Sequence, residues 1–152
     1  MNDIEMMRVA LDAARSAIAS GDIPVGAAIF NSSGEIVSIG HNERELHQDP
    51  TAHAEIVAIR RAAGKLGDWH LTDHTLVVTL EPCAMCAGAI AQSRLQTVVF
   101  GAWDEKAGAV GSVWDLLRDP RSTFRTEVRA GVLADECGEL ITSFIQEVRK
   151  KD

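Results

Sequence analysis

Apolar residues follow a helical period at both ends of this chain. Near the start they recur at steps of three and four residues, at Ile4, Met7, Leu11, Ala14 and Ile18. This spacing predicts an amphipathic helix that ends near Gly21. Near the other end, similar spacing predicts a long helix from Asp135 to Lys150 with one apolar face, formed by Leu140, Ile141, Phe144, Ile145 and Val148.

Short β-prone runs occupy the middle of the chain. Residues 24–30 and 35–40 are two such runs, and the Asn31-Ser32-Ser33-Gly34 segment between them is typical of a hairpin turn. Further strands are predicted at residues 75–80, 97–101 and 127–132.

Helices and loops are predicted between the strands. One helix runs from about His53 to Lys65, with Thr51 or Asp49 as its cap, after a polar loop over residues 41–50. Others are predicted over residues 83–93 and, as a short helix, 113–118. Five strands with helices between them indicate an α/β fold, a three-layer α/β/α sandwich around a five-stranded mixed sheet.

Composition agrees with one domain over residues 1–152. The chain is 46% hydrophobic and 24% charged, which is enough to bury a core. No apolar run approaches the length of a membrane span, so we expect a cytoplasmic protein with no membrane association. The three cysteines do not form a disulfide framework, and we expect Cys137, on the apolar face of the last helix, to be a small core residue.

The formal net charge of −7 argues against a protein that grips long stretches of nucleic acid through its phosphates. A local contact is still compatible with this charge. Solvated surfaces and compensation of a helix dipole explain the basic clusters equally well. These clusters are Arg118, Arg121, Arg125 and Arg129, and then Arg149, Lys150 and Lys151.

Two segments contain the residues with the clearest chemistry, His53-Ala54-Glu55 and Pro82-Cys83-Ala84-Met85-Cys86. One imidazole and two thiolates suit Zn²⁺, and three protein ligands leave the fourth tetrahedral position for water, as in catalytic zinc sites. We therefore predict one Zn²⁺ per chain, held by His53, Cys83 and Cys86. Glu55 is then free to take a proton from the water and pass it to a substrate.

Helix geometry restricts where this site can lie. Cys83 and Cys86 are three residues apart and share a face at the start of one predicted helix. His53 and Glu55 are two residues apart and point to nearly opposite sides of another. Both can reach one metal only from the first turn, so we expect the zinc between two helix N-termini, beyond the carboxyl end of a strand.

Two other interpretations of these residues stay open at this point. A C-x-x-C pair at the start of a helix is also typical of thioredoxin-like redox proteins, which do not require the upstream His-x-Glu. A non-enzymatic structural zinc module would need a fourth protein ligand, and nothing near either motif supplies one except Glu55.

The two motifs together resemble the H-x-E and P-C-x-x-C signature of zinc-dependent nucleobase deaminases. From Ile23 to Cys137 the chain resembles the bacterial tRNA-specific adenosine deaminases, most clearly in residues 49–55, 80–89, 99–102 and 104–112. The resemblance implies a cytidine deaminase-like fold. It also implies a homodimer that converts adenosine to inosine at the wobble position, the first anticodon position of a tRNA.

The resemblance implies roles for particular residues as well. Besides the three zinc ligands and the proton carrier, it implies Asn42 as a polar contact to the nucleotide, with Asp104 and Lys106 beside the bound anticodon nucleotides. A turn-forming acid that bonds its own backbone is an alternative for Asp104. His41 and Trp103 depart from the pattern: an aromatic residue is expected at the first and a basic one at the second, where Trp103 offers a stacking surface instead.

An acidic protein can still bind an anticodon loop, because RNA loops are read largely through splayed, stacked bases. The apolar face of the last helix ends in positive charge, which makes Phe144, Arg149 and Lys150 candidate RNA contacts. The main alternative is a zinc-dependent deaminase of a free base or nucleoside, such as guanine or cytosine. The loop over residues 104–112 and the Arg-rich stretch after it favour the RNA substrate.

Overall fold

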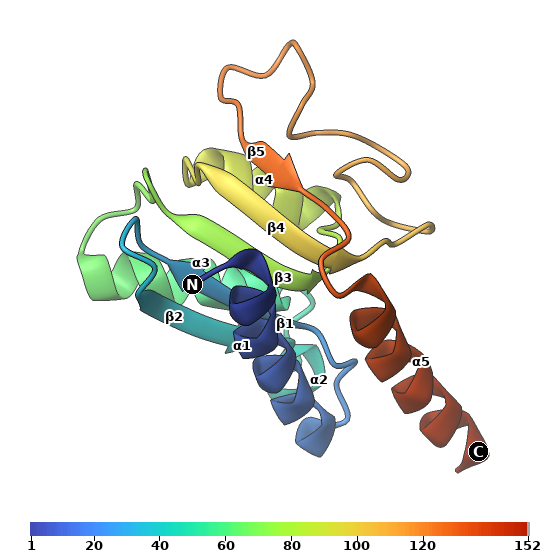
Figure 1. The fold of residues 1–152 in the computed structure, drawn as a ribbon. Coiled ribbons are helices and arrows are strands. Elements are labelled where there is room, and N and C mark those ends of the chain that lie inside the picture. Colours follow the sequence, from blue (N-terminus) through green and yellow to red (C-terminus); the bar gives the residue numbers. More distant parts are fainter. Residues whose placement is uncertain (152) are drawn as a thin grey trace.

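Five strands form one mixed sheet in the computed structural model, which describes residues 1–151 (Figure 1). In spatial order they are β2 (Ile36–His41), β1 (Gly26–Phe30), β3 (Thr75–Leu80), β4 (Thr97–Ala102) and β5 (Glu127–Arg129). β1 is antiparallel to both of its neighbours, while β3, β4 and β5 are parallel to one another. The prediction of a five-stranded mixed sheet is therefore confirmed.

Helices cover both faces of this sheet. α1 (Asp3–Ser16) and α5 (Ala134–Lys150) pack on one face, and α3 (Ala54–Leu66) and α4 (Ala84–Gln92) pack on the other (Figure 1). One apolar core, which includes Ala58 and Ile90, lies under α3 and α4. A second core, which includes Leu11 and Cys137, lies under α1 and α5. The three-layer arrangement and the burial of Cys137 are confirmed.

Gly40 brings the start of α3 close to the sheet. A Cβ atom at Gly40 would lie 2.8 Å from the carbonyl oxygen of Ala54 and 2.8 Å from the backbone nitrogen of Ala58. A side chain at this position would force the helix away from β2, because the contacts are with backbone atoms that cannot rotate aside. The glycine therefore sets the position of the first turn of α3.

The predicted polar loop over residues 41–50 contains a one-turn helix, α2 (Arg44–His47). Its start is held by the buried Asp22, whose carboxylate accepts the backbone N–H of Glu45 at 2.6 Å and of Leu46 at 3.2 Å. Periodicity cannot reveal this helix, because its stabilising carboxylate comes from a remote part of the chain.

Other boundaries also differ from the predictions. The segment over residues 113–118 has bends and an isolated β-bridge between Asp115 and Val110 instead of a helix, and β5 ends at Arg129. Ile18 falls in a 3₁₀ turn beyond the end of α1. Both Ile18 and Ile4 are exposed, because α1 packs on the sheet mainly through Met7, Ala10, Leu11 and Ala14.

No helix within residues 1–151 combines the length and the apolar character needed to cross a membrane.

Candidate active site

His53 and Cys83 each occupy the position immediately before a helix. His53 is the N-cap of α3, Cys83 is the N-cap of α4, and both have extended backbone. Within residues 1–151, neither side chain accepts a hydrogen bond from the first turn of its helix, so both can face another group. The prediction of Thr51 or Asp49 as the cap is wrong, because Asp49 instead accepts the backbone N–H and the hydroxyl of Thr51.

The three predicted ligands converge between these two helix N-termini. Nδ1 of His53 lies 3.6 Å from Sγ of Cys83 and 3.5 Å from Sγ of Cys86, and the three ligand atoms lie within 4.8 Å of one another. Zn–S and Zn–N bonds of about 2.3 and 2.0 Å at a tetrahedral angle place nitrogen and sulfur about 3.5 Å apart. The side chains are therefore spaced to hold a zinc ion, with Nδ1 as the coordinating atom of the imidazole.

Contacts among the three side chains shift their pKa values. Hydrogen bonds with Cys86 and then with His53 lower the pKa of Cys83 to about 3, whereas the contact with Cys83, followed by burial, raises the pKa of Cys86. The hydrogen bond with Cys83 raises the pKa of His53. The cluster therefore shares protons, which a dipositive cation would displace, because thiolate and neutral imidazole are the metal-binding forms.

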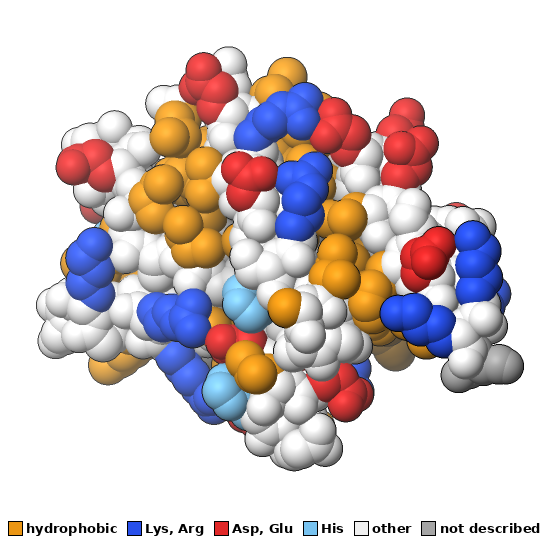
Figure 2. All heavy atoms as spheres, turned by 90° about the horizontal axis from the view of Figure 1, so that it is seen from below, with side chains coloured by type: hydrophobic (Ala, Val, Ile, Leu, Met, Phe, Trp, Pro, Cys, Tyr) orange, Lys and Arg blue, Asp and Glu red, His pale blue; other side chains and the backbone are white. Residues whose placement is uncertain are grey.

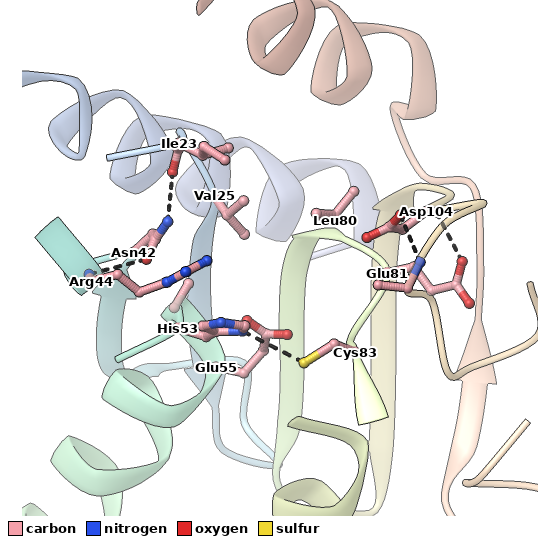
Figure 3. Close-up of a pocket in the computed structure, with 12 residues that line it drawn as sticks. Ile23, Val25, Asn42, Arg44, His53, Glu55, Leu80, Glu81, Cys83 and Asp104 are labelled. Carbon is pink, nitrogen blue, oxygen red and sulfur yellow. Dashed lines mark hydrogen bonds between the residues drawn. The ribbon is translucent and has the colours of Figure 1, made fainter. Parts of the chain in front are cut away.

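Glu55 lies in the first turn of α3, beside the three ligand atoms. It is 4% exposed, and its carboxylate lies near the imidazole of His53 and faces Cys83 (Figure 3). Burial raises the pKa of Glu55 to about 7. Within residues 1–151, no fourth His, Cys, Asp or Glu joins the ligand cluster, which argues against a closed structural zinc site.

A cavity of about 230 Å³ opens beside these side chains. Sites for drug-sized ligands are typically ~300–1,000 Å³, so this volume suits a single small ring system. Its walls are mainly apolar. The lining residues are Ile23, Val25, Asn42, Arg44, His53, Ala54, Glu55, Leu80, Glu81, Cys83, Asp104 and Ala107 (Figure 3).

Asn42 lines the cavity, as its predicted role requires. Its Nδ2 donates to the carbonyl oxygen of Ile23 at 3.2 Å, and its Oδ1 accepts the backbone N–H of Arg44 at 3.2 Å. These two bonds fix the amide orientation. Because an amide group has two donor hydrogens and two acceptor lone pairs, one further hydrogen bond is available at each atom.

Asp104 also lines the cavity, but its carboxylate is engaged by its own loop. Its Oδ1 accepts the backbone N–H groups of Lys106 at 3.1 Å and of Ala107 at 3.2 Å. This is the turn-forming alternative. Lys106 is exposed and lies outside the lining, where Ala107 takes its place.

The predicted RNA contacts on α5 are not brought to the cavity. Phe144 is half-buried, and Arg149 and Lys150 are exposed in the last turn. The outer part of α5 extends beyond the sheet in Figure 1, and Figure 2 shows Lys and Arg side chains beside hydrophobic ones on this lower face of the molecule. Trp103 and His41 also lie outside the lining, and Trp103 is 49% exposed with its ring edge-on to Phe100.

Two residues of the cavity wall were not predicted, Arg44 and Glu81. In the sequence they are marked only by their neighbours: Arg44 lies two residues after Asn42, and Glu81 lies directly before Pro82. Arg44 starts α2 and extends over the cavity in Figure 3. Glu81 is 2% exposed; burial by itself raises its pKa, but hydrogen bonds from Ser112, Asp104 and Val110 together lower it below the usual value.

Comparison with known proteins agrees with this geometry. Residues 1–102 match the family model of the cytidine and deoxycytidylate deaminase zinc-binding region. The chain is 46% identical over 145 residues to the tRNA-specific adenosine deaminase of Bacillus subtilis (strain 168), covering 95% of this chain and 89% of that protein.

The chain is also similar to solved structures of deaminases. One comes from a study of A-to-I editing by tRNA:A34 deaminases at the wobble position; it has a TM-score of 0.85 at 38% identity and covers 90% of this chain and 98% of that one. The guanine deaminase of Nitrosomonas europaea has a TM-score of 0.78 at 28% identity, with 93% of this chain and 83% of that chain covered. The cytidine deaminase-like fold is thereby confirmed.

These matches define the class: the chain is a zinc-dependent deaminase of the cytidine and deoxycytidylate deaminase family. Within it, the chain belongs to the tRNA-specific adenosine deaminases, given 46% identity over 95% of its length. Zinc is the cofactor of this family, in agreement with the cluster of one imidazole and two thiols. The redox interpretation of Cys83 and Cys86 is set aside.

Proposed function

We propose that this protein deaminates adenosine to inosine at the first anticodon position of a tRNA, and that residues 1–152 act as one deaminase domain. The observation that carries the proposal is the cluster of His53, Cys83 and Cys86 with a separate, buried Glu55 beside a small cavity. The substrate is supported by the relatives, since the B. subtilis relative is a tRNA-specific adenosine deaminase.

In the proposed reaction, His53, Cys83 and Cys86 hold one Zn²⁺, and Glu55 carries protons. When bound, zinc lowers the pKa of a water molecule toward neutrality. Glu55 accepts a proton from the attacking water and delivers it to the ring nitrogen beside the attacked carbon; it then takes the remaining proton of the added hydroxyl group and passes it to the departing amine. Water adds to the carbon, the bond to the exocyclic nitrogen breaks, and inosine and ammonia are the products.

The cavity can hold a base that has been unstacked from its neighbours in the RNA. Val25 and Leu80 supply apolar surface for the base, and Asn42 supplies polar atoms. The reacting group must come to Glu55, because that carboxylate is buried and cannot reach out to a stacked base. Bases in RNA loops are unstacked at lower cost than bases in a duplex, which supports an anticodon loop as the substrate.

The proposal also gives Arg44 a role as a phosphate contact at the cavity. Its side chain is exposed, lines the cavity and carries a positive charge in an acidic protein. Three of the four arginines between residues 118 and 129, by contrast, already form ion pairs with carboxylates: Arg118, Arg121 and Arg129. Those pairs favour the solvated-surface interpretation of that cluster.

Substitution of Arg44 by Ala should weaken binding of every anticodon stem-loop by a similar factor. The slope of log Kd against log salt concentration should fall by about 1, because one phosphate contact is lost. Equilibrium binding at several salt concentrations measures both. Arg121→Ala is the matched control, since Arg121 is exposed, pairs with Asp119 and lies in the β4–β5 connection; a slope unchanged in Arg44→Ala would remove Arg44 from the RNA interface.

We also propose that Phe144, Arg149 and Lys150 on α5, together with Lys106, contact RNA outside the cavity. Replacing Arg149 and Lys150 by Ala together should weaken stem-loop binding at low salt. The melting temperature should change little, because both side chains are exposed and, among residues 1–151, the ion pair of Lys150 with Glu147 is the only one that either forms. Unaltered affinity at low salt would exclude the end of α5 from the interface.

We further propose a cytoplasmic homodimer with one Zn²⁺ per subunit. Val113, Trp114 and Leu116 are large apolar residues that lie close together in sequence and are exposed, which is typical of a contact surface. Two zinc-binding thiolates require reducing surroundings, and the cytoplasm supplies both these and the tRNA substrate.

The test of this function is a comparison of substrates. Zinc-loaded protein is incubated with an anticodon stem-loop that carries adenosine at the first anticodon position, and separately with free adenosine, guanine and cytosine. Inosine in the RNA, detected by mass spectrometry of its nucleosides, supports the proposal. Ammonia released from guanine or cytosine alone would replace it with a free-base deaminase, such as the guanine deaminase that shares this fold.

A further inference from the structure

We propose that Glu81 is a positioning residue, whose buried carboxylate holds the 104–112 loop in the shape that completes the substrate cavity. This role deepens the proposed function and rests on it. Glu81 is 2% exposed and lies directly before Pro82 and the ligand Cys83. Its side chain points away from Cys83, toward the loop that carries Asp104 (Figure 3).

Each oxygen of Glu81 accepts hydrogen bonds from this loop. Oε1 accepts the backbone N–H of Asp104 at 3.0 Å and a hydrogen bond from the hydroxyl of Ser112. Oε2 accepts the backbone N–H groups of Val110 and Ser112, each at 3.0 Å. One carboxylate thus binds both ends of the loop, and its charge is compensated by loop donors, because within residues 1–151 it forms no ion pair with a Lys, Arg or His.

The backbone of the loop passes directly over this carboxylate. At Gly108 an added Cβ would lie 2.3 Å from Cδ of Glu81, so a side chain there would collide with it. Gly108 also forms a β-bridge with Cys83, and the N–H of Ala109 donates to the carbonyl oxygen of Pro82 at 2.8 Å. The loop is therefore joined to the segment that carries Cys83 both through its backbone and through Glu81.

The connection between the 104–112 loop and Glu81 helps to shape the substrate cavity. Asp104 and Ala107 line the cavity, and both belong to the section of loop that Glu81 closes. The ligand side chains lie at the starts of α3 and α4, and the contacts of His53 run to the sulfur atoms of Cys83 and Cys86. Weakening the carboxylate should therefore displace the cavity wall while the metal cluster stays in place, so substrate binding should suffer before the chemical step does.

The test is Glu81→Gln, which keeps the shape but replaces one acceptor oxygen with an NH₂ group that faces loop donors. For the anticodon stem-loop we expect KM to rise about tenfold, the effect of losing about one hydrogen bond to a charged group. We expect kcat to stay within about threefold of wild type and zinc content to stay at one per chain. Amide hydrogen exchange at Asp104, Val110 and Ser112 should become faster.

Two further variants separate positioning from loss of stability. Ser112→Ala removes one donor only and should change KM and loop exchange in the same direction by a smaller factor, so it replaces Glu81→Gln if that variant does not fold. Thr126→Val removes a buried hydrogen bond to the carbonyl oxygen of Leu95 and should lower the melting temperature with KM unchanged.

The outcomes distinguish this inference from the proposed function. No inosine in the stem-loop with the wild-type protein would overturn the proposed function. With the wild-type protein active, an unchanged KM and unchanged loop exchange in Glu81→Gln and Ser112→Ala would overturn the role of Glu81. A rise in KM that Thr126→Val reproduces would overturn it as well, because the effect would then follow stability alone.

Discussion

Replacing Glu55 by Gln should lower kcat for deamination by about 10²–10⁴-fold while the protein still binds one zinc ion, because general acid–base catalysis contributes a factor of this size. The substitution is nearly isosteric, so the first turn of α3 and the cavity keep their shape. What is lost is the ability to accept and return a proton. Glu55 lies beside the ligand cluster and outside it, so metal binding should not depend on its charge.

The measurement is single-turnover deamination of the stem-loop, with zinc determined by atomic spectroscopy on the same sample. Glu43→Gln is the matched control, since Glu43 is also a buried carboxylate, contacts Arg61 and His47, and lies outside the cavity lining. It should retain nearly full activity. Deamination at the wild-type rate by Glu55→Gln would remove Glu55 from the mechanism, and loss of zinc would show that its role is structural.

Replacing Cys86 by Ala should abolish stable zinc binding, and deamination should fall in parallel with zinc content. Cys86 is fully buried, and its sulfur lies 3.5 Å from Nδ1 of His53. Changes to groups that only support a ligand commonly cost ~10–100-fold in metal affinity, so loss of a ligand itself should cost more. The melting temperature should also fall, because binding of the metal to the folded state stabilises it.

Cys137→Ala is the control for this experiment. Cys137 is 1% exposed, and burial raises the pKa of its thiol to about 11, so it resembles Cys86 in residue type and burial but lies in the core under α1 and α5. It should lose some stability through the small cavity and keep one zinc ion per chain. Full zinc content in Cys86→Ala after dialysis against a chelator, or loss of zinc in Cys137→Ala, would contradict the assigned ligand set.

Short-range patterns in the sequence were sufficient for most of the elements. The strand over residues 75–80, the hairpin turn at residues 31–34 and the long last helix depend on neighbouring side chains, and the structure has them where the periods predict. The helix predicted at residues 113–118 is wrong, because backbone N–H groups of that segment donate to the preceding loop, as that of Leu116 does to the carbonyl oxygen of Ala109. The start of α2 escaped prediction because Asp22 stabilises it from a distant turn.

The sequence by itself determined the chemistry available to this protein: one imidazole, two thiols and one carboxylate, each in or next to the first turn of a helix, because ligand type and helix position are local properties. Only the tertiary structure decided what these groups do together. The packing of α3 and α4 on the same face of the sheet brings His53 to within 3.6 Å of Cys83, although 30 residues separate them. It likewise decided that Asp104 is engaged by its own loop, that Arg44 joins the cavity and that Glu81 holds the opposite wall. The physical reason is that such contacts depend on the order of strands in the sheet and on the path of the connecting loops, which no local period of the sequence encodes.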